Sequence, residues 1–431
     1  MYTFKRLLAT FAVGLGHASI FNTIIAIYVP ASIKTLFNNS ATALGVITGI
    51  GSLWQILGIV LALISDRVQF KLGRRRPFIS FGALLTLIAL ALFILNEQLD
   101  NLLTQRILFL TGYYLAMIGL SIIQMLTSTL LVDLISKEQQ GTGSGIVSLY
   151  QVLGSVLGFG MVALELETTY LLIVFIGAMS VCALLTLTSA KEKQYKRADD
   201  ESLNIITIVK DLRFKPSNHR NFVLVSICRF LTFAGLGIQM FFIFWLSDVL
   251  LLPNPETSMS YVALVMLACG VLFAIPIGKI CDKASKKKLM MFGHCSLIVF
   301  IIGMIFVNSF WQVFITGVFL SLGQISYGAS ELAFTCSVLP NPTKSGSYLA
   351  LFGLLIMAGM SFGSLCFGSV LDFFETEMST PEARSYSHFG YIVIFCLALM
   401  FWLCAFIVAT RITIPSKQEE RTMKEIDEDL I

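Results

Sequence analysis

The stretch from Ser65 to Ile79, SDRVQFKLGRRRPFI, is a short charged island between two long apolar segments. Asp66 precedes a set of cations, which are Arg67, Lys71, Arg74, Arg75 and Arg76. Cations gathered between hydrophobic spans stay on the cytoplasmic side of a membrane, because moving each charge across the hydrocarbon is costly. Gly73 permits a sharp turn, and Pro77 suits the first turn of a following helix. The island therefore predicts a cytoplasmic loop between two membrane spans.

The composition also indicates an integral membrane protein. Apolar residues make up 56% of the chain, charged residues make up 13%, and the mean hydropathy is +0.82. A chain of 431 residues accommodates about twelve spans of about 20 residues. We therefore expect an all-α integral membrane fold. The expected spans are Leu7–Pro30, Leu44–Ile64, Phe78–Leu95, Ile107–Leu134, Ser144–Leu164, Tyr170–Ser189, Phe222–Leu246, Tyr261–Gly278, Leu289–Val307, Val313–Leu339, Ser347–Leu371 and Phe389–Thr410.

The distribution of basic residues tests these spans, because a miscounted span would scatter the cations over both faces. Every Lys and Arg falls in a terminus or in a loop expected to be cytoplasmic, except Lys34, Arg106, Arg229 and Arg384. Both termini are thus expected on the cytoplasmic side of a plasma membrane. Lys34, Arg106 and Asp248 are expected to be solvated ends near the outer face. The net charge of +4 hides this asymmetry and does not indicate nucleic acid. The expected partners of this monomer are the lipid bilayer and a small molecule.

A second charged island, GKICDKASKKK, runs from Gly278 to Lys288 between two later apolar segments. Its Asp282 and Lys283 correspond to Asp66 and Arg67. Two such loops resemble the major facilitator superfamily, in which the loops between helices 2 and 3 and between helices 8 and 9 carry a repeated motif. The GRRRPFI form is similar to the sugar-proton symporter branch, which includes plant sucrose symporters, their animal solute-carrier relatives and similar bacterial proteins. The second copy departs from the motif because it is shorter and lacks the glycine.

This resemblance, which covers nearly the whole chain, implies two pseudo-symmetric six-helix halves with substrate near the midplane between them. It also implies that both charged islands form a cytoplasmic gate; the gate residues are Asp66, Arg67, Gly73, Arg74, Arg75, Arg76, Asp282 and Lys283. GLGHAS at Gly14–Ser19 and GLGIQM at Gly235–Met240 occupy matching places in the two halves. The expected boundaries are 1–190 for the first half, 191–220 for a cytoplasmic linker, 221–411 for the second half and 412–431 for a cytoplasmic tail.

Two further patterns concern packing. Gly154 with Gly158, and Gly359 with Gly363, form small-xxx-small faces that let neighbouring helices approach closely. The middle of the linker, Leu203–Phe214, has apolar residues at helical intervals. It is either a helix lying on the membrane surface or a solvated connector.

Arg229 and Glu331 are ionisable residues inside expected spans, where an unpaired charge is costly and marks a functional candidate. Arg229 lies nine residues after Arg220, and Glu331 lies nine residues before Pro340, so both are about 13 Å from the cytoplasmic side. The segment Tyr327–Pro340 resembles a family segment with an acid at the place of Glu331. The two residues are either a proton-coupling site or a permanent salt bridge between helices 7 and 10.

The remaining candidates for the substrate and proton pathway are neutral or titratable side chains. His17, in the first span, is either a packing residue or a proton carrier. Amide and phenol groups in helices 1, 4, 7 and 10 suit a neutral polyhydroxylated substrate, although they also serve as hydrogen bonds between helices. These residues are Asn22, Gln124, Gln239, Gln324 and Tyr327, with Trp54, Gln55, Tyr150 and Gln151 as lesser candidates.

No motif indicates an enzyme, because the chain has no Walker-type glycine loop, no HExxH and no CxxC pair. Its nine cysteines lack paired spacing, and we interpret them as small apolar fillers rather than metal ligands. We predict a secondary transporter working by alternating access without a cofactor, driven by an ion gradient, with proton-coupled uptake of a sugar or glycoside as the main hypothesis. The alternatives are a proton-coupled exporter of drugs or metabolites and a transporter-like nutrient sensor.

Overall fold

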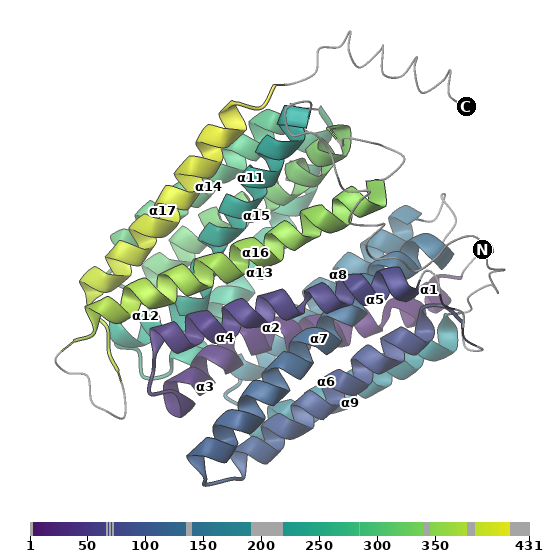
Figure 1. The fold of residues 1–431 in the computed structure, drawn as a ribbon, viewed down its shortest axis with the longest axis horizontal. Coiled ribbons are helices and arrows are strands. Elements are labelled where there is room, and N and C mark those ends of the chain that lie inside the picture. The colour runs from purple at the N-terminus through teal and green to yellow at the C-terminus, as the bar shows by residue number, and fades with distance from the viewer. Residues whose placement is uncertain are drawn as a thin grey trace.

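The protein is a bundle of long helices (Figure 1). The computed structural model describes residues 3–65, 68, 70, 73–134, 140–190, 219–283, 285–338, 345–376 and 384–413. Twelve helices in these ranges are long and apolar enough to cross a membrane. A helix satisfies its backbone hydrogen bonds within one segment, which is what a lipid environment requires. The expected all-α membrane fold is confirmed.

Each half of the chain contributes six of these spans. The elements of the first half are α1 (Phe4–Phe11), α2 (Val13–Thr23), η1 (Ile24–Tyr28), α3 (Val29–Leu36), α4 (Ala41–Trp54), α5 (Ile56–Ser65), α6 (Arg76–Glu97), α7 (Leu102–Leu134), α8 (Gln140–Ala163) and α9 (Thr168–Ser189). Those of the second half are α11 (Arg220–Leu236), η4 (Gly237–Phe241), α12 (Phe242–Asp248), α13 (Pro255–Lys283), α14 (Lys286–Ile305), α15 (Phe310–Ser337), α16 (Ser345–Leu371), η6 (Asp372–Phe374) and α17 (His388–Thr410).

The first span of each half is interrupted near its middle. In the first half, the π-helical turn η1 precedes Pro30, which lacks a backbone N–H and whose ring crowds the carbonyl of Ala26. In the second half, the tight turn η4 begins at Gly237. Irregular turns inside helices are frequent at functional sites. Both turns border the central cavity described below.

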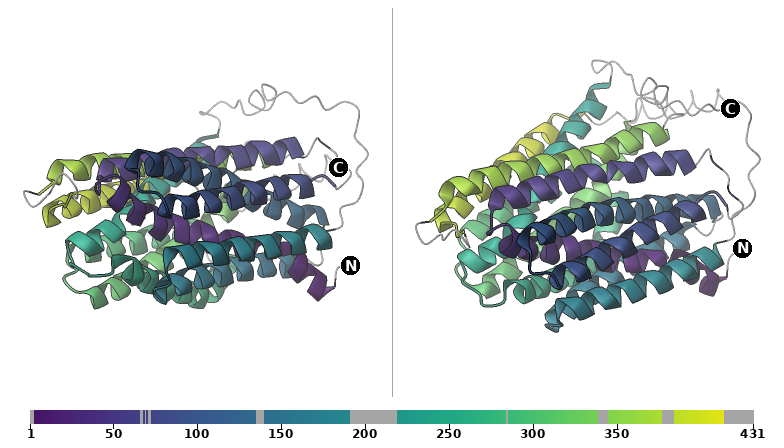
Figure 2. Two further views of the ribbon diagram at one scale, coloured as in Figure 1. Left: turned by 90° about the horizontal axis from the view of Figure 1, so that it is seen from below. Right: turned by 60° about the horizontal axis from the view of Figure 1, so that its bottom comes forward.

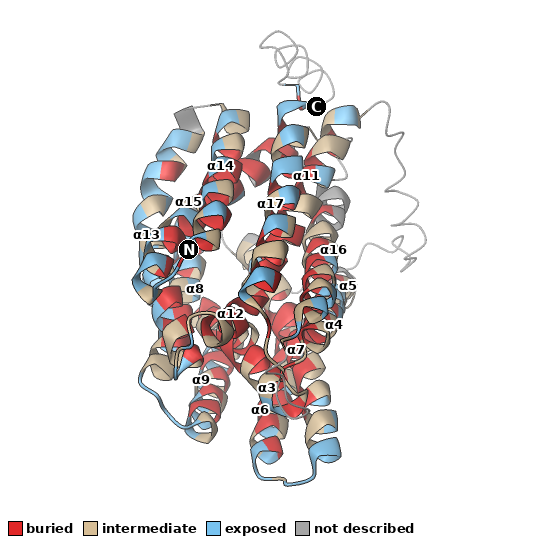
Figure 3. Cartoon of the chain, turned by 90° about the vertical axis from the view of Figure 1, so that its left-hand side faces the viewer, coloured by how far each residue is buried: buried red, intermediate tan, exposed pale blue. Residues whose placement is uncertain are grey.

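Glycines bring helices of the same half into close contact, as the two small-xxx-small patterns predict. The Cα atoms of Gly154 and Gly158 face the backbone of α2, and a Cβ at either position would collide with it. Gly363 faces the carbonyl of Ala234 on α11 in the same way. These contacts pack neighbouring helices of one half against each other, and the helices run along the length of the molecule (Figure 2). Residues between the helices are buried, and residues on the outer surface are exposed (Figure 3). Many of the exposed residues are large and apolar.

The two ends of the bundle differ in charge. We call the end where α6 and α14 begin the basic end, because Arg74–Arg76 and Lys286–Lys288 lie there. We call the opposite end, where the halves are hydrogen-bonded to each other, the closed end. The expected surface helix Leu203–Phe214 lies outside the described residues, as do most of the linker and of the tail.

Asp372 is the centre of the hydrogen bonds at the closed end. Its carboxylate accepts from the backbone N–H groups of Ala41 (3.1 Å) and Thr42 (3.2 Å), the first two residues of α4. A carboxylate at this position satisfies free donors and faces the positive end of the helix dipole. Asp372 belongs to the second half and α4 to the first, so this helix cap joins the halves.

Tyr386 and Arg384 extend the same junction. The phenol oxygen of Tyr386 accepts from Ala41 N (2.8 Å) and lies 2.6 Å from Asp372 Oδ1. Burial, together with the hydrogen bond to Asp372, raises the pKa of Tyr386, so the phenol stays protonated and donates to the carboxylate. Asn39 Nδ2 donates to the carbonyl of Arg384 at 2.6 Å, and Arg384 N donates to the carbonyl of Asn38 at 3.0 Å.

Three residues expected to be solvated ends are instead bonded at the closed end, so that expectation was wrong. Lys34 Nζ donates to Ser247 Oγ at 2.7 Å, and Arg106 Nε donates to the carbonyl of Leu36 at 2.6 Å. Asp248 Oδ2 accepts from the phenol of Tyr391 at 2.7 Å and from Tyr386 N at 3.2 Å. Each of these three residues has a partner far away in the sequence, so its position near the end of a span could not predict the contact.

Candidate substrate cavity and coupling site

A cavity of about 570 Å³ lies between the two halves. Its walls come from α2, η1, α4 and α7 of the first half and from α11, η4, α14, α15 and α16 of the second half. Polar residues expected on the substrate pathway account for much of its lining. These are Asn22, Gln124, Gln239, Gln324, Tyr327 and Glu331, together with Gln55.

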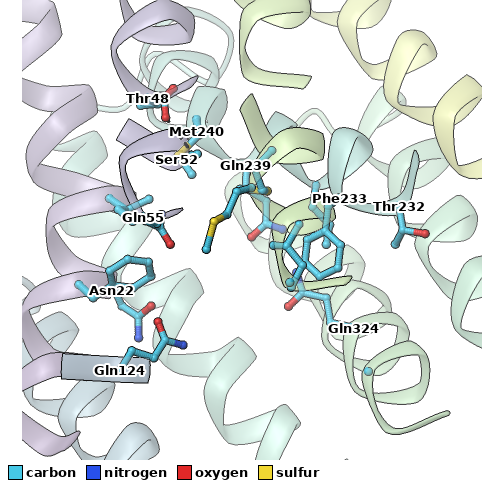
Figure 4. Close-up of a pocket in the computed structure, with 18 of the residues that line it drawn as sticks. Asn22, Thr48, Ser52, Gln55, Gln124, Thr232, Phe233, Gln239, Met240 and Gln324 are labelled. Atoms are coloured by element: carbon cyan, nitrogen blue, oxygen red, sulfur yellow. Dashed lines mark hydrogen bonds between the residues drawn. The ribbon is translucent and has the colours of Figure 1, made fainter. Parts of the chain in front are cut away.

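Five amide side chains from both halves face this cavity (Figure 4). They comprise Asn22, Gln55 and Gln124 from the first half and Gln239 and Gln324 from the second half. Each amide both donates and accepts hydrogen bonds without carrying a charge. Asn22 Nδ2 donates to Ser155 Oγ at 2.6 Å, which fixes its orientation on α2. The arrangement can bind a neutral solute with several hydroxyl groups.

Hydroxyl groups add acceptors that the sequence did not single out. Thr48, Ser52 and Thr232 line the cavity. Thr48 and Ser52 donate to carbonyls of their own helix, and the Thr232 hydroxyl lies within hydrogen-bond distance of both the carbonyl of Cys228 and His294 Nε2. Their oxygen lone pairs remain to accept from a ligand. Apolar side chains complete the walls; among them are Phe21, Tyr113, Met125, Phe233, Met240, Met357 and Met360. The sequence alone could not single out these hydroxyl groups, because it does not show which face of each helix points into the cavity.

Arg229 and Glu331 form a buried ion pair between α11 and α15, as their shared depth predicted. Arg229 is 8% exposed and Glu331 is 4% exposed. The guanidinium lies 4.0 Å from the ring centroid of Phe352, and Tyr327 OH donates to Glu331 Oε1 at 3.3 Å. Glu331 is the one charged side chain among the described residues that line the cavity. It therefore lies where a change of its charge would be felt by a bound substrate.

His17 lies apart from these groups. Its ring stacks on Phe21 at 5.4 Å, and it borders a minor pocket that Gln124 and Gln151 also line. The central cavity is lined by Phe21 and Gln124 rather than by His17. The structure therefore places His17 behind the wall of the central cavity. Its position in the first span did not predict this.

His294 is a second buried histidine, which the sequence analysis overlooked because it lies on α14. Its Nε2 is 2.9 Å from Thr232 Oγ1, and its Nδ1 is 2.9 Å from the carbonyl of Met290. Its ring meets the ring of Tyr327 edge to face at 5.0 Å. His294 thus supports two residues of the cavity wall, Thr232 and Tyr327.

The described part of the gate motif bonds within the first half. Gly73 has a φ of 112°, which is the left-handed conformation that the sharp turn required. Arg74 and Arg75 both pair with Asp133 of α7, at 2.6 Å and 2.9 Å. Arg76 donates to the carbonyl of Leu187 on α9. These contacts tie α6 to α7 and α9.

Four gate residues cannot be placed in this way. Asp66 and Arg67 lie outside the described residues. Asp282 and Lys283 end α13, but their side chains are likewise outside the described part of the chain. A contact of these residues with the opposite half therefore stays a prediction.

A bundle of twelve spans with a polar cavity between its halves defines a secondary transporter of the major facilitator fold. Known structures share this fold. A mutant of the nucleoside transporter NupG superposes with a TM-score of 0.74 at 12% identity, covering 95% of this chain and 100% of that chain. A mutant of the peptide transporter POT superposes with a TM-score of 0.72 at 12% identity, covering 96% of each chain.

The sequence matches the family described as MFS/sugar transport protein over residues 10–416. The general alpha-glucoside permease of Schizosaccharomyces pombe is 25% identical over 198 residues, which cover 44% of this chain and 33% of the permease. Sucrose transport protein SUC3 of Arabidopsis thaliana is 25% identical over 163 residues, 30% of this chain and 27% of that protein. The matched region spans about a third or less of these relatives. The chain belongs to the MFS/sugar transport protein family, a family of transporters and not of enzymes.

Proposed function

We propose that the protein is a proton-coupled importer of a neutral sugar or glycoside. The observation that carries this proposal is the convergence of five uncharged amides on a cavity in which Glu331 is the one carboxylate among the described residues. The amides supply hydrogen bonds to hydroxyl groups, and the carboxylate supplies a site that can take up and release a proton. The matched regions of the α-glucoside permease and the sucrose transport protein support the same substrate class.

We further propose that the protein lies in a plasma membrane, with its basic end and both termini on the cytoplasmic side. The reason is that the Lys and Arg residues gather at the basic end. The halves, 1–190 and 221–411, then move against each other around the cavity. At the closed end a Cβ at Gly45 would collide with the backbone of Ser364, whereas beside the central cavity a Cβ at Gly353 would meet only the side chain of Ile59. The structure is thus interpreted as the inward-facing state.

An exporter of cationic drugs is the second candidate, and the ion pair argues against it. A lipophilic cation needs an unpaired carboxylate, whereas Glu331 is already paired with Arg229. Binding a cation there would leave the guanidinium without its counter-charge in a buried site. The cavity is therefore better matched to a neutral solute.

Uptake into proteoliposomes tests the proposal. The purified protein is reconstituted, and a panel of labelled mono- and disaccharides and their glycosides is offered with and without an inward proton gradient. We expect at least one neutral sugar to accumulate above its external concentration only when the gradient is present. Uptake that equilibrates without responding to the gradient would contradict proton coupling. Binding without uptake would instead identify a sensor.

A further inference from the structure

A second cavity of about 940 Å³ lies between α8 of the first half and α13 of the second half. It adjoins the central cavity, because Asn22, Gln239 and Gln324 line both. From these amides it extends along the facing sides of the two helices. The combined space is therefore larger than a sugar ring requires and has two chemically different ends.

The part beyond the amides is a mostly apolar crevice, in which Ser148 and Ser321 are the polar side chains among the described residues. Its walls include Leu149 and Val152 on α8 and Ala263, Leu267 and Val271 on α13. No charged side chain occurs among the described residues that line it. Apolar surface of this kind binds an apolar group and gains nothing from a hydroxyl.

The crevice breaks the pseudo-symmetry of the bundle. On the other side of the molecule α4 and α16 form the matching junction between halves, and 44% of each span is buried. In contrast, 28% of the most apolar window of the α8 span and 17% of that of the α13 span are buried, the two lowest values among the twelve candidate spans. Tyr261 of α13 donates to the carbonyl of Ala163 on α8 at 3.2 Å, which joins the two helices at the closed end. The junction between α8 and α13 is thus less completely covered by other helices than the junction between α4 and α16.

We propose that the transported molecule is a neutral amphiphile, whose polar head binds the amides while its apolar tail lies in the α8–α13 crevice. This inference rests on the proposed function and names its substrate class: a glycoside carrying an alkyl or similar apolar group rather than a free sugar. A phospholipid is a poorer match, because its phosphate would need a cation and none lines the crevice in the described chain. The same absence of charge disfavours an ionic amphiphile.

Competition between matched glycosides tests the proposal. In proteoliposomes, methyl and hexyl β-glucosides and the corresponding maltosides compete with whichever labelled sugar the uptake panel identifies. The hexyl compounds should inhibit at concentrations about tenfold or more below those of the methyl compounds, because each buried methylene favours binding. Equal inhibition by both members of a pair would overturn the proposal.

Substitution of Gly145 locates the tail. Gly145 of α8 lines the crevice, and a Cβ there would meet no heavy atom within 4 Å. Gly145→Leu therefore places an apolar side chain in the crevice from an unhindered Cβ position. It should remove most of the preference for hexyl over methyl glycosides, with methyl inhibition within about twofold of the parent. Gly160→Leu is the matched control, because Gly160 lies on the same helix with equally free surroundings but does not line the crevice. It should leave both compounds unaffected.

The remaining outcomes separate this inference from the proposed function. If no glycoside binds or is transported, the proposed function itself fails. If methyl and hexyl compounds bind equally while Gly145→Leu lowers the amount of co-purified phospholipid detected by mass spectrometry, the crevice holds lipid and only the inference fails. If Gly145→Leu weakens the binding of methyl and hexyl glycosides equally, the apolar tail does not lie in the crevice and the inference fails.

Discussion

Glu331 is the residue on which the proposed proton coupling depends, because it is the charged side chain that lines the cavity among the described residues. Glu331→Gln keeps the size of the side chain but cannot take up and release a proton. We expect this variant to lose accumulation driven by a proton gradient while it retains exchange of substrate across the membrane. Proteoliposomes preloaded with unlabelled sugar measure both activities. Full uphill accumulation by Glu331→Gln would transfer the coupling role to His17 or to another ion.

The pair with Arg229 makes a second measurement necessary, because removing one partner leaves a buried charge. Either Glu331→Gln or Arg229→Gln alone should destabilise the protein by about 3–5 kcal/mol, and the double variant should recover much of this. Thermal unfolding in detergent measures the recovery. If the pair is only structural, the double variant also recovers uphill transport. If it is a coupling site, stability returns but uphill transport does not.

Gln324 tests sugar recognition at the level of a single amide. Gln324→Ala should weaken binding of the neutral substrate by about 1–2 kcal/mol, because one or two hydrogen bonds to hydroxyl groups are lost. Gln151→Ala is the matched control, since Gln151 borders the minor pocket beside His17 instead of the central cavity. Titration of both variants with labelled sugar measures the difference. Reduced thermal stability with unchanged affinity would assign Gln324 to packing.

At the scale of helices, Gly363 tests how closely α16 packs on α11. A Cβ at Gly363 would collide with the backbone of Ala234, whereas a Cβ at Gly177 of α9 would meet nothing within 4 Å. Gly363→Ala should therefore lower stability by about 1–3 kcal/mol through overpacking. Gly177→Ala should be neutral or slightly stabilising, since alanine favours helix. Midpoints of thermal unfolding compare the two, and equal midpoints would show that α16 moves aside without cost.

The elements were predictable to the extent that they depend on local composition. Apolar runs and basic loops predicted the spans and their number, because the membrane imposes length and charge asymmetry on any sequence. The expected first span, Leu7–Pro30, instead continues to Leu36 through the turn η1. A proline inside an apolar run indicates an interruption, but it does not show whether the chain ends there or carries on.

The candidate site was predictable where a polar side chain lay in one of the helices expected to line the cavity. Asn22, Gln124, Gln239 and Gln324 reach the cavity as expected. His294 and Asp372 were not predicted, because their roles depend on contacts with residues distant in the sequence. His294 contacts Thr232, and Asp372 contacts Ala41. Such contacts follow from the packing of whole helices, which local patterns do not encode.

At the scale of the whole molecule, the cap that Asp372 places on α4 is the contact that opposes opening of the closed end. Alternating access requires this junction to break, so its free energy directly sets the balance between the two states. Asp372→Ala removes acceptors for Ala41 N, Thr42 N and the Tyr386 phenol. A loss of about 1–3 kcal/mol corresponds to a shift of about 5- to 150-fold towards the state that is open at this end.

Hydrogen–deuterium exchange followed by mass spectrometry measures this shift. In Asp372→Ala, peptides covering residues 39–45 and 368–374 should exchange faster, because the cap and its neighbours are released. Peptides at the basic end, such as those from α5 and the adjoining part of α16, should exchange more slowly, because closure there accompanies opening at the other end. Glu167→Gln is the control, since Glu167 is an exposed carboxylate at the same end. Faster exchange at both ends would mean that Asp372 stabilises the fold as a whole and does not govern the equilibrium between the two states.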